Sequence, residues 1–87
     1  MAGVTTKARS FRAKLSRVLT QAFPGAAVQL DQSKPLGKFS GLVVWDGFGG
    51  LEQVDRQARL WKRLRAELSK EEQLKITAIL TMTPAER

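Results

Sequence analysis

The sequence predicts an α+β fold, a two-layer sandwich in which two helices cover one face of a three-stranded mixed sheet. Two segments carry apolar residues at helical spacing, and three shorter segments have the alternation or β-branched content of strands. They follow one another in the order helix, strand, strand, helix, strand, which indicates a two-layer α+β domain. Because 87 residues suffice for one domain, we expect a flexible N-terminal end at 1–7 and a single domain at 8–87.

The first helix is predicted to begin at Lys7 and to end at Pro24-Gly25, a pair that stops helices. Its apolar residues recur at steps of three and four positions, as they do on one face of a helix. This stripe comprises Phe11, Leu15, Val18, Leu19, Ala22 and Phe23. We expect the stripe to be buried against the sheet.

Two strands are predicted after this helix. In "AAVQLDQ", Val28 and Leu30 alternate with polar residues, which predicts a half-buried strand. The segment "FSGLVVWD" is more continuously apolar, so we expect it to be the central strand. The short turn "SKPLGK" between them predicts that the two strands are antiparallel.

A second helix is predicted after "DGFGG". Its buried side is expected to consist of Val54, Ala58, Trp61, Leu64, Arg65 and Leu68, with Leu60 on the flank. Arg56, Arg59 and Arg63 are expected to form an exposed ridge on the opposite side, with Lys62 beside it.

The remaining residues complete the predicted sheet. "SKEEQ" is predicted to be a short polar connection, and "LKITAILTM" is predicted to be the third strand because it is rich in Ile and Thr. A strand–helix–strand crossover places this strand parallel to the second one. Thr83-Pro84 is predicted to start a further helical turn.

The composition argues against an enzyme and against a metal site. The chain has no cysteine and no histidine, which excludes disulfides, thiolate ligands, histidine ligands and histidine bases within it. Glu71-Glu72 lies in a polar run and does not form a convincing catalytic carboxylate pair. We therefore expect no catalytic residue, no metal and no cofactor.

The sequence also bears on location. It contains no apolar run long enough to cross a membrane and no signal-peptide core. The first 30 residues lack acidic side chains, as mitochondrial transit peptides do, but residues 8–23 are needed by the predicted fold. We expect a cytoplasmic protein ahead of a mitochondrial or plastid one.

The net charge of +7 is concentrated in one half of the chain. Residues 1–43 carry seven bases and one acid, whereas residues 44–87 carry eight bases and seven acids. A positive field attracts polyanions such as nucleic acid, anionic membranes or acidic proteins. The alternative is that the charge serves solubility alone.

Three segments resemble the BolA-like family, whose fold is similar to that of class II KH domains: "FSGLVVWDGFGGLEQV", "RQARLWKRLRAEL" and "LKITAILTMTPAE". The resemblance extends from about residue 8 to residue 86. The residues that match the family pattern are Phe48, Gly50, Val54, Arg56, Thr83, Pro84 and Glu86. The resemblance implies the fold already predicted from the order of elements.

The sequence departs from the family pattern at three positions. Gln57 follows Arg56 where many members have histidine, and Arg87 replaces the usual tryptophan. Lys75 stands where most members have the histidine expected to ligate a [2Fe–2S] cluster shared with a monothiol glutaredoxin. A protonated lysine has no lone pair to donate, so we expect the cluster chemistry to be absent, with Lys75 marking a partner-binding position.

The glycine loop is the last candidate feature. Gly47 and Gly50 have the G-x-x-G spacing with which KH domains clamp a nucleic-acid backbone. Glycines let backbone N–H groups approach phosphates closely. The alternative is a tight bend with Phe48 in the core, and Trp45 and Trp61 are expected to be core residues.

These observations lead to two functional hypotheses. The first is a non-enzymatic BolA-like regulatory protein that binds DNA or RNA. Its predicted binding residues are Gly47, Gly49, Gly50, Arg56, Arg59, Lys62 and Arg63. The second, implied by the resemblance, is an adaptor for a monothiol glutaredoxin in iron–sulfur assembly or iron homeostasis.

Overall fold

The computed structural model describes residues 3–33 and 37–87, and it describes side chains from residue 11 onward. The elements in chain order are α1 (Gly3–Ala22), β1 (Ala27–Gln32), β2 (Phe39–Val44), η1 (Asp46–Phe48), α2 (Gln53–Glu67), α3 (Lys70–Gln73), β3 (Ile76–Met82) and η2 (Pro84–Glu86). Here η1 and η2 are single 3-10 turns. The predicted order is confirmed, and the helical turn predicted at Thr83-Pro84 is η2. The turn η1 was not predicted, and the predicted polar connection "SKEEQ" instead forms the one-turn helix α3.

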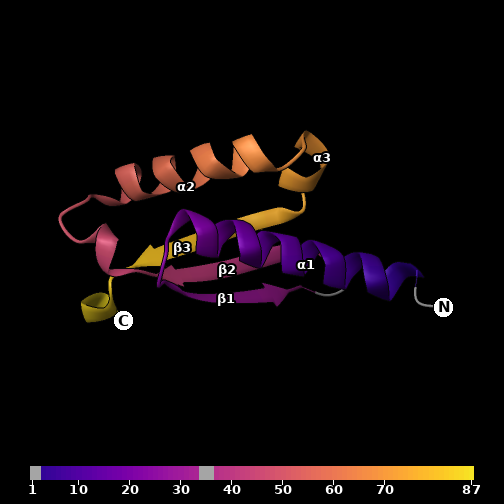
Figure 1. Cartoon of the computed structure of the whole chain (residues 1–87), viewed down its shortest axis with the longest axis horizontal. Helices are drawn as coiled ribbons and strands as arrows, with labels where there is room; N and C mark the ends of the chain where they lie inside the picture. The colour runs from indigo at the N-terminus through magenta and orange to yellow at the C-terminus, as the bar shows by residue number, and fades with distance from the viewer. Residues whose placement is uncertain (1–2, 34–36) are drawn as a thin grey trace.

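The three strands form one mixed sheet in the order β1-β2-β3. β1 and β2 are antiparallel, and β2 and β3 are parallel, as predicted. The glycine-rich loop after β2 and the C-terminal turn lie at one end of the sheet, whereas α3 lies at the other end (Figure 1). The predicted two-layer α+β sandwich with a central β2 is confirmed.

The core lies between the sheet and the helices. Leu15 of α1, Val43 of β2 and Phe48 of η1 have no exposed surface. The buried core cluster comprises Phe11, Leu15, Val18, Leu19, Phe23, Phe39, Val43, Phe48, Leu60, Leu64, Leu68, Ile76 and Ile79. The predicted stripe of α1 is therefore buried, with Ala22 half-buried at its end.

α1 begins earlier than predicted. It starts at Gly3 rather than at Lys7, so residues 3–7, which lie within the end expected to be flexible, are helical. Once a helix is nucleated, each added residue gains a backbone hydrogen bond, so a helix can extend beyond its buried stripe. Part of the predicted turn "SKPLGK", residues 34–36, lies outside the described residues.

The orientation of α2 differs from the prediction. Leu60 and Leu64 are fully buried, and Arg56, predicted to be exposed, is only 5% exposed. Three residues predicted to be buried are instead exposed: Val54, Ala58 and Arg65. The buried face runs through Arg56, Leu60 and Leu64 at four-residue steps, roughly a quarter turn from the predicted one. The error arose because an arginine was assumed to face solvent.

Side chains of the two long helices donate to carbonyls of the outer strands. Arg12 Nη1 donates to the carbonyl of Leu30 in β1 at 2.6 Å. On the other outer strand, Gln57 Nε2 donates to the carbonyl of Ile79 at 2.8 Å. Unpaired backbone groups on outer strands invite pairing with other chains, so these contacts protect the sheet.

Candidate nucleic-acid interface

The glycine loop is shaped by close contacts inside the protein. A Cβ atom at Gly47 would overlap with the indole ring of Trp45, so that ring can cover the loop only because residue 47 is glycine. Gly50 has φ of 81°, a left-handed conformation that glycine adopts without strain. Phe48 between them is fully buried, as the bend interpretation predicts.

Several amides of this loop already have acceptors within the chain. The N–H of Phe48 donates to Trp45 O at 3.2 Å, and the N–H of Gly49 donates to Asp46 O at 3.0 Å. The N–H of Leu51 donates to the carbonyl of Phe48 at 3.0 Å. A phosphate cradle needs such N–H groups to point toward the ligand. The contacts therefore favour a bend over a phosphate cradle built from the amides of Phe48, Gly49 and Leu51, and the binding roles of Gly47 and Gly50 stay predictions.

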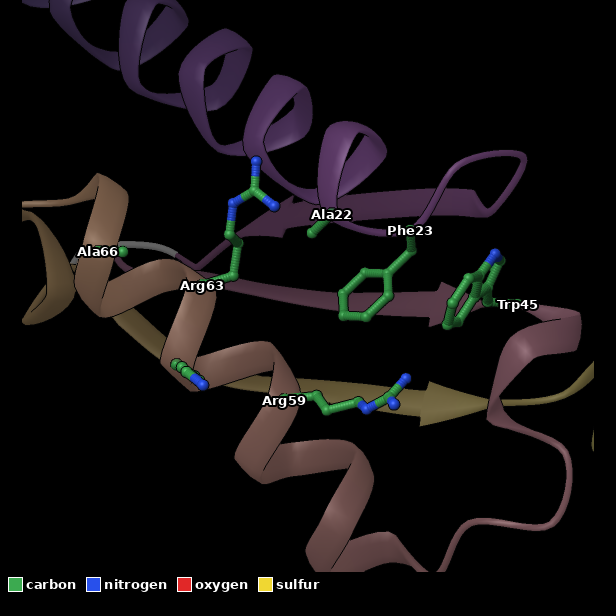
Figure 2. Close-up of a pocket in the computed structure, with 7 residues that line it drawn as sticks. Ala22, Phe23, Trp45, Arg59, Arg63 and Ala66 are labelled. Atoms are coloured by element: carbon green, nitrogen blue, oxygen red, sulfur yellow. The ribbon is translucent and has the colours of Figure 1, made fainter.

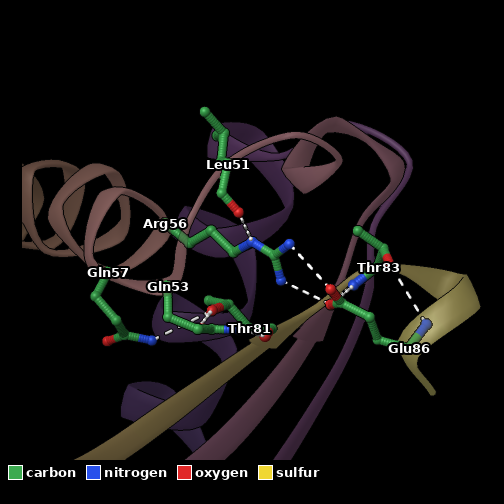
Figure 3. Close-up of polar contacts among 7 residues, drawn as sticks. All are labelled: Leu51, Gln53, Arg56, Gln57, Thr81, Thr83 and Glu86. Atoms are coloured by element: carbon green, nitrogen blue, oxygen red, sulfur yellow. Dashed lines mark hydrogen bonds and ion pairs between the residues drawn. The ribbon is translucent and has the colours of Figure 1, made fainter.

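Arg56 lies at the centre of a hydrogen-bonded cluster that joins α2 to the C-terminus (Figure 3). Its Nε donates to the carbonyl of Leu51 at 2.8 Å. Its two terminal nitrogens donate to the two carboxylate oxygens of Glu86 at 2.7 and 3.1 Å. The Glu86 carboxylate also accepts the N–H of Thr83 at 2.8 Å, which caps the last 3-10 turn.

This ion pair shifts the pKa of both partners. The hydrogen bond from Arg56, followed by the one from the Thr83 N–H, lowers the pKa of Glu86 to about 2. The hydrogen bond to Glu86 raises the pKa of Arg56 above its ordinary value. Both groups therefore stay charged across the neutral range.

Arg56 is consequently not part of an exposed basic ridge. Its guanidinium is held by Leu51 and Glu86, and its side chain is 6% exposed. A bidentate arginine–carboxylate pair is a specific and directional contact. The prediction that Arg56 belongs to an exposed ridge is wrong for this physical reason, whereas its role as a nucleic-acid ligand stays a prediction that the ion pair does not support.

The other three basic residues of the predicted set lie together around a pocket (Figure 2). Arg59, Lys62 and Arg63 line one side of a cavity of about 290 Å³. Its remaining lining comes from Ala22, Phe23, Trp45 and Ala66. α2 thus places three cations beside an apolar and aromatic surface formed by the end of α1 and the end of β2.

The cations of this pocket remain accessible. Arg59 and Lys62 are exposed, and the Arg63 side chain is 42% exposed. Arg63 Nε contacts Glu67 Oε2 at 3.3 Å, an exposed pair one helical turn apart whose strength is small. Among the described residues, neither Arg59 nor Lys62 forms an ion pair.

Trp45 is the pocket residue that the sequence prediction did not assign to a site. It packs partly against the core, as predicted, but it is half-buried and presents part of its ring to the pocket. Its Nε1 donates to the carbonyl of Pro24 at 2.8 Å, and its ring meets those of Phe23 and Phe48 at 5.1 and 5.2 Å. Its place at the end of a strand, next to a glycine loop, was the available signal.

Lys75 does not join this pocket. It precedes β3, and its Nζ lies 5.1 Å from the centre of the Phe11 ring. Phe39 N–H donates to the carbonyl of Lys75 at the start of β2, so Lys75 sits at the end of the sheet away from Trp45. Within the described part of the chain, no group of three or more metal-binding side chains occurs.

Comparison with known proteins places this geometry in a known fold. No protein-family model matches the chain, and no curated protein matches it. The solved structure of BolA1 from Arabidopsis thaliana has a TM-score of 0.70 and 21% identity, covering 88% of this chain and 95% of its own. The chain has a BolA-like fold. A bol-like protein from Babesia bovis gives a TM-score of 0.56 and 20% identity, covering 85% of each chain.

The BolA-like fold predicted from the sequence is therefore confirmed. At 20–21% identity these likenesses establish the architecture and not the activity. In the described residues, no helix is both long and apolar enough to cross a membrane.

Proposed function

We propose that this protein is a small, non-enzymatic BolA-like regulatory protein that binds nucleic acid through Arg59, Lys62 and Arg63. The observation that supports it is the pocket in which these three cations of α2 lie next to Trp45. Cationic side chains attract the phosphate backbone, and a partly exposed aromatic ring offers a surface for a base. A surface that is charged only for solubility would not require an aromatic ring such as Trp45 beside the cations.

The remaining charge of the chain supports the same proposal. The net charge of +7 makes the protein a general attractor of polyanions, which raises the rate of encounter. The three cations beside the pocket then supply the local contacts. The glycine loop contributes by letting Trp45 lie over Gly47, rather than by offering its own amides.

The test is a pair of triple variants that remove the same charge from opposite ends of the sheet. The site variant is Arg59→Gln, Lys62→Gln and Arg63→Gln. The control variant is Lys38→Gln, Lys70→Gln and Lys75→Gln. Lys38 and Lys75 directly precede β2 and β3, and Lys70 is the first residue of α3. Both variants lower the net charge by three, so a generic charge effect weakens both equally.

The readout is fluorescence anisotropy with labelled DNA and RNA across a salt series. We expect the site variant to bind at least about tenfold more weakly. The slope of log affinity against log salt concentration should become shallower by about two, because fewer phosphates are contacted and fewer counterions are released on binding. The control variant should stay close to the unmodified protein. Equal weakening of both variants would show that the charge is generic.

The adaptor hypothesis for a monothiol glutaredoxin stays a prediction. It concerns the other end of the sheet, where Lys75 lies beside Phe11. The same control variant therefore serves a pull-down with a monothiol glutaredoxin. Capture that the control variant abolishes and the site variant keeps would favour the adaptor function.

A further inference from the structure

We propose that the pocket beside Trp45 holds the base of an unpaired nucleotide, and that the protein therefore selects single-stranded over duplex nucleic acid. This inference rests on the proposed function and names its substrate class. It depends on the size of the pocket, on the rigidity of its aromatic wall and on the position of its cations.

The size of the pocket fits one small planar group. Its volume of about 290 Å³ lies just below the range for sites of drug-sized ligands, which begins at about 300 Å³. The pocket lies between α2 and the ends of α1 and β2 (Figure 2). An intact duplex keeps its bases stacked inside the helix, so only an unpaired base can enter.

The aromatic wall is held in place before any ligand arrives. Trp45 Nε1 donates to the carbonyl of Pro24 at 2.8 Å, and Gly47 allows the ring to lie close against the loop. Phe23 and Phe48 contact the ring from inside the protein, at 5.1 and 5.2 Å between centroids. A fixed ring loses little freedom when a base stacks on it, which favours binding.

The cations sit where the sugar–phosphate of such a nucleotide would leave the pocket. Arg59 reaches toward Trp45, and Arg63 reaches toward α1 (Figure 2). Lys62 and Arg63 lie three and four positions after Arg59, so each is a neighbour of Arg59 on the helix surface. A ligand with one flat apolar ring and a phosphate can contact both the aromatic wall and the cations of the pocket. An inorganic phosphate would leave the aromatic wall uncovered, and a purely apolar ligand would leave the cations without a partner.

The experiment follows the fluorescence of Trp45 alone. Trp61→Phe removes the second of the two tryptophans, since the chain has no others. This protein is titrated with a single-stranded adenine hexanucleotide, a duplex hairpin with the same number of phosphates, adenosine 5′-monophosphate and ribose 5-phosphate. We expect the single strand to quench Trp45 and to bind at least about fivefold tighter than the hairpin. Adenosine 5′-monophosphate should quench at higher concentration, and ribose 5-phosphate should not quench.

Two pocket variants separate this inference from the proposed function. Trp45→Leu removes the stacking surface, and Ala66→Leu fills the pocket from an exposed helix position that accepts leucine well. Both should lose the preference for single strands, because the affinity for the single strand falls to that for the hairpin. Circular dichroism and thermal unfolding check that both are folded, and Ala66→Leu covers the case in which Trp45→Leu unfolds.

The outcomes are distinguishable. Binding of the single strand and the hairpin with equal affinity, with Trp45 unquenched, would overturn the pocket inference and leave the proposed function standing. Quenching by an anionic aromatic peptide in preference to the nucleotide would also overturn it and would indicate a protein ligand. No binding of either polymer would overturn the proposed function together with it.

Discussion

Gly47 and Trp45 show how one missing side-chain atom shapes the candidate site. The indole ring occupies the space that a Cβ of residue 47 would take. This contact holds the ring between Phe23, Phe48 and the pocket. Gly47 therefore acts through close packing, and Gly50 acts through its positive φ.

We predict that Gly47→Ala destabilises the protein by about 1–3 kcal/mol, because the added methyl group overpacks the contact with Trp45. The matched control is Gly49→Ala, whose new Cβ would lie 3.3 Å from Asp46 O and would require only a small adjustment. Urea unfolding measures both. Equal losses would mean that loop flexibility, and not the ring contact, requires glycine at residue 47.

The role of Arg56, like that of Gly47, is set by a contact with another part of the chain. Its side chain has an acidic partner thirty positions along the chain, and its guanidinium carbon lies 5.8 Å from the centre of the Phe48 ring. Such a partner cannot be identified from helical periodicity, because periodicity describes only residues within one helix. A lone arginine on a predicted helix is therefore poor evidence for a binding ridge.

At the scale of elements, α2 both covers the sheet and protects its edge. Gln53 Nε2 donates to the carbonyl of Thr81 at 2.9 Å, and Gln57 Nε2 donates to the carbonyl of Ile79 at 2.8 Å. The Thr81 hydroxyl, which is buried, donates to Gln53 Oε1 at 2.7 Å. Gln57 stands where many members of the BolA-like family have histidine, and here its side chain binds the backbone of β3.

We predict that Gln57→Ala costs about 1 kcal/mol of unfolding free energy, because it removes the donor to the carbonyl of Ile79. The control is Gln21→Ala, an exposed glutamine of α1, which should change stability little. Urea unfolding at neutral pH compares the two. If both variants behave alike, the side-chain contact to β3 contributes nothing.

At the scale of the whole molecule, two carboxylates tie distant segments together. Glu86 joins the C-terminal turn to α2 through Arg56, and Glu72 joins α3 to α1 through Lys14 at 3.0 Å. The N–H of Ser69, followed by Lys14, lowers the pKa of Glu72. The pKa of Glu86 is lowered to about 2. A carboxylate with a lowered folded-state pKa stabilises the fold above its ordinary pKa and ceases to do so as it is protonated.

We predict that the melting temperature falls steeply as the pH drops from the ordinary value of 4.5 to about 2, the interval over which Glu86 takes up its proton. Glu86→Gln should lower the melting temperature at neutral pH. It should also make the melting temperature depend less on pH between 4.5 and about 2. Glu71→Gln, at an exposed neighbour of Glu72, is the control and should keep the original dependence. Circular dichroism at a series of pH values measures it. If the melting temperature of Glu86→Gln fell with pH as steeply as that of the unmodified protein, the ion pair between Arg56 and Glu86 would not contribute to stability.

The sequence by itself determined the two long helices and the three strands of the protein, their order and the fold class. Phe11 to Phe23 revealed α1 through their spacing, and "FSGLVVWD" revealed the central strand through its continuous apolar character. These signals are local, because a helix or a strand repeats its pattern within a few residues. They also indicated that Phe48 is buried under the bend, and they placed Arg59, Lys62 and Arg63 on one helix.

Only the tertiary structure decided which face of α2 is buried and where the candidate site lies. Glu86 withdraws Arg56 from the surface, and the end of α1 brings Phe23 beside Trp45 and α2. Both are contacts between residues far apart in sequence, so they depend on how the elements pack. The spacing of apolar and polar residues within either segment does not indicate them. The pocket exists because three elements meet at one end of the sheet, which no single stretch of sequence encodes.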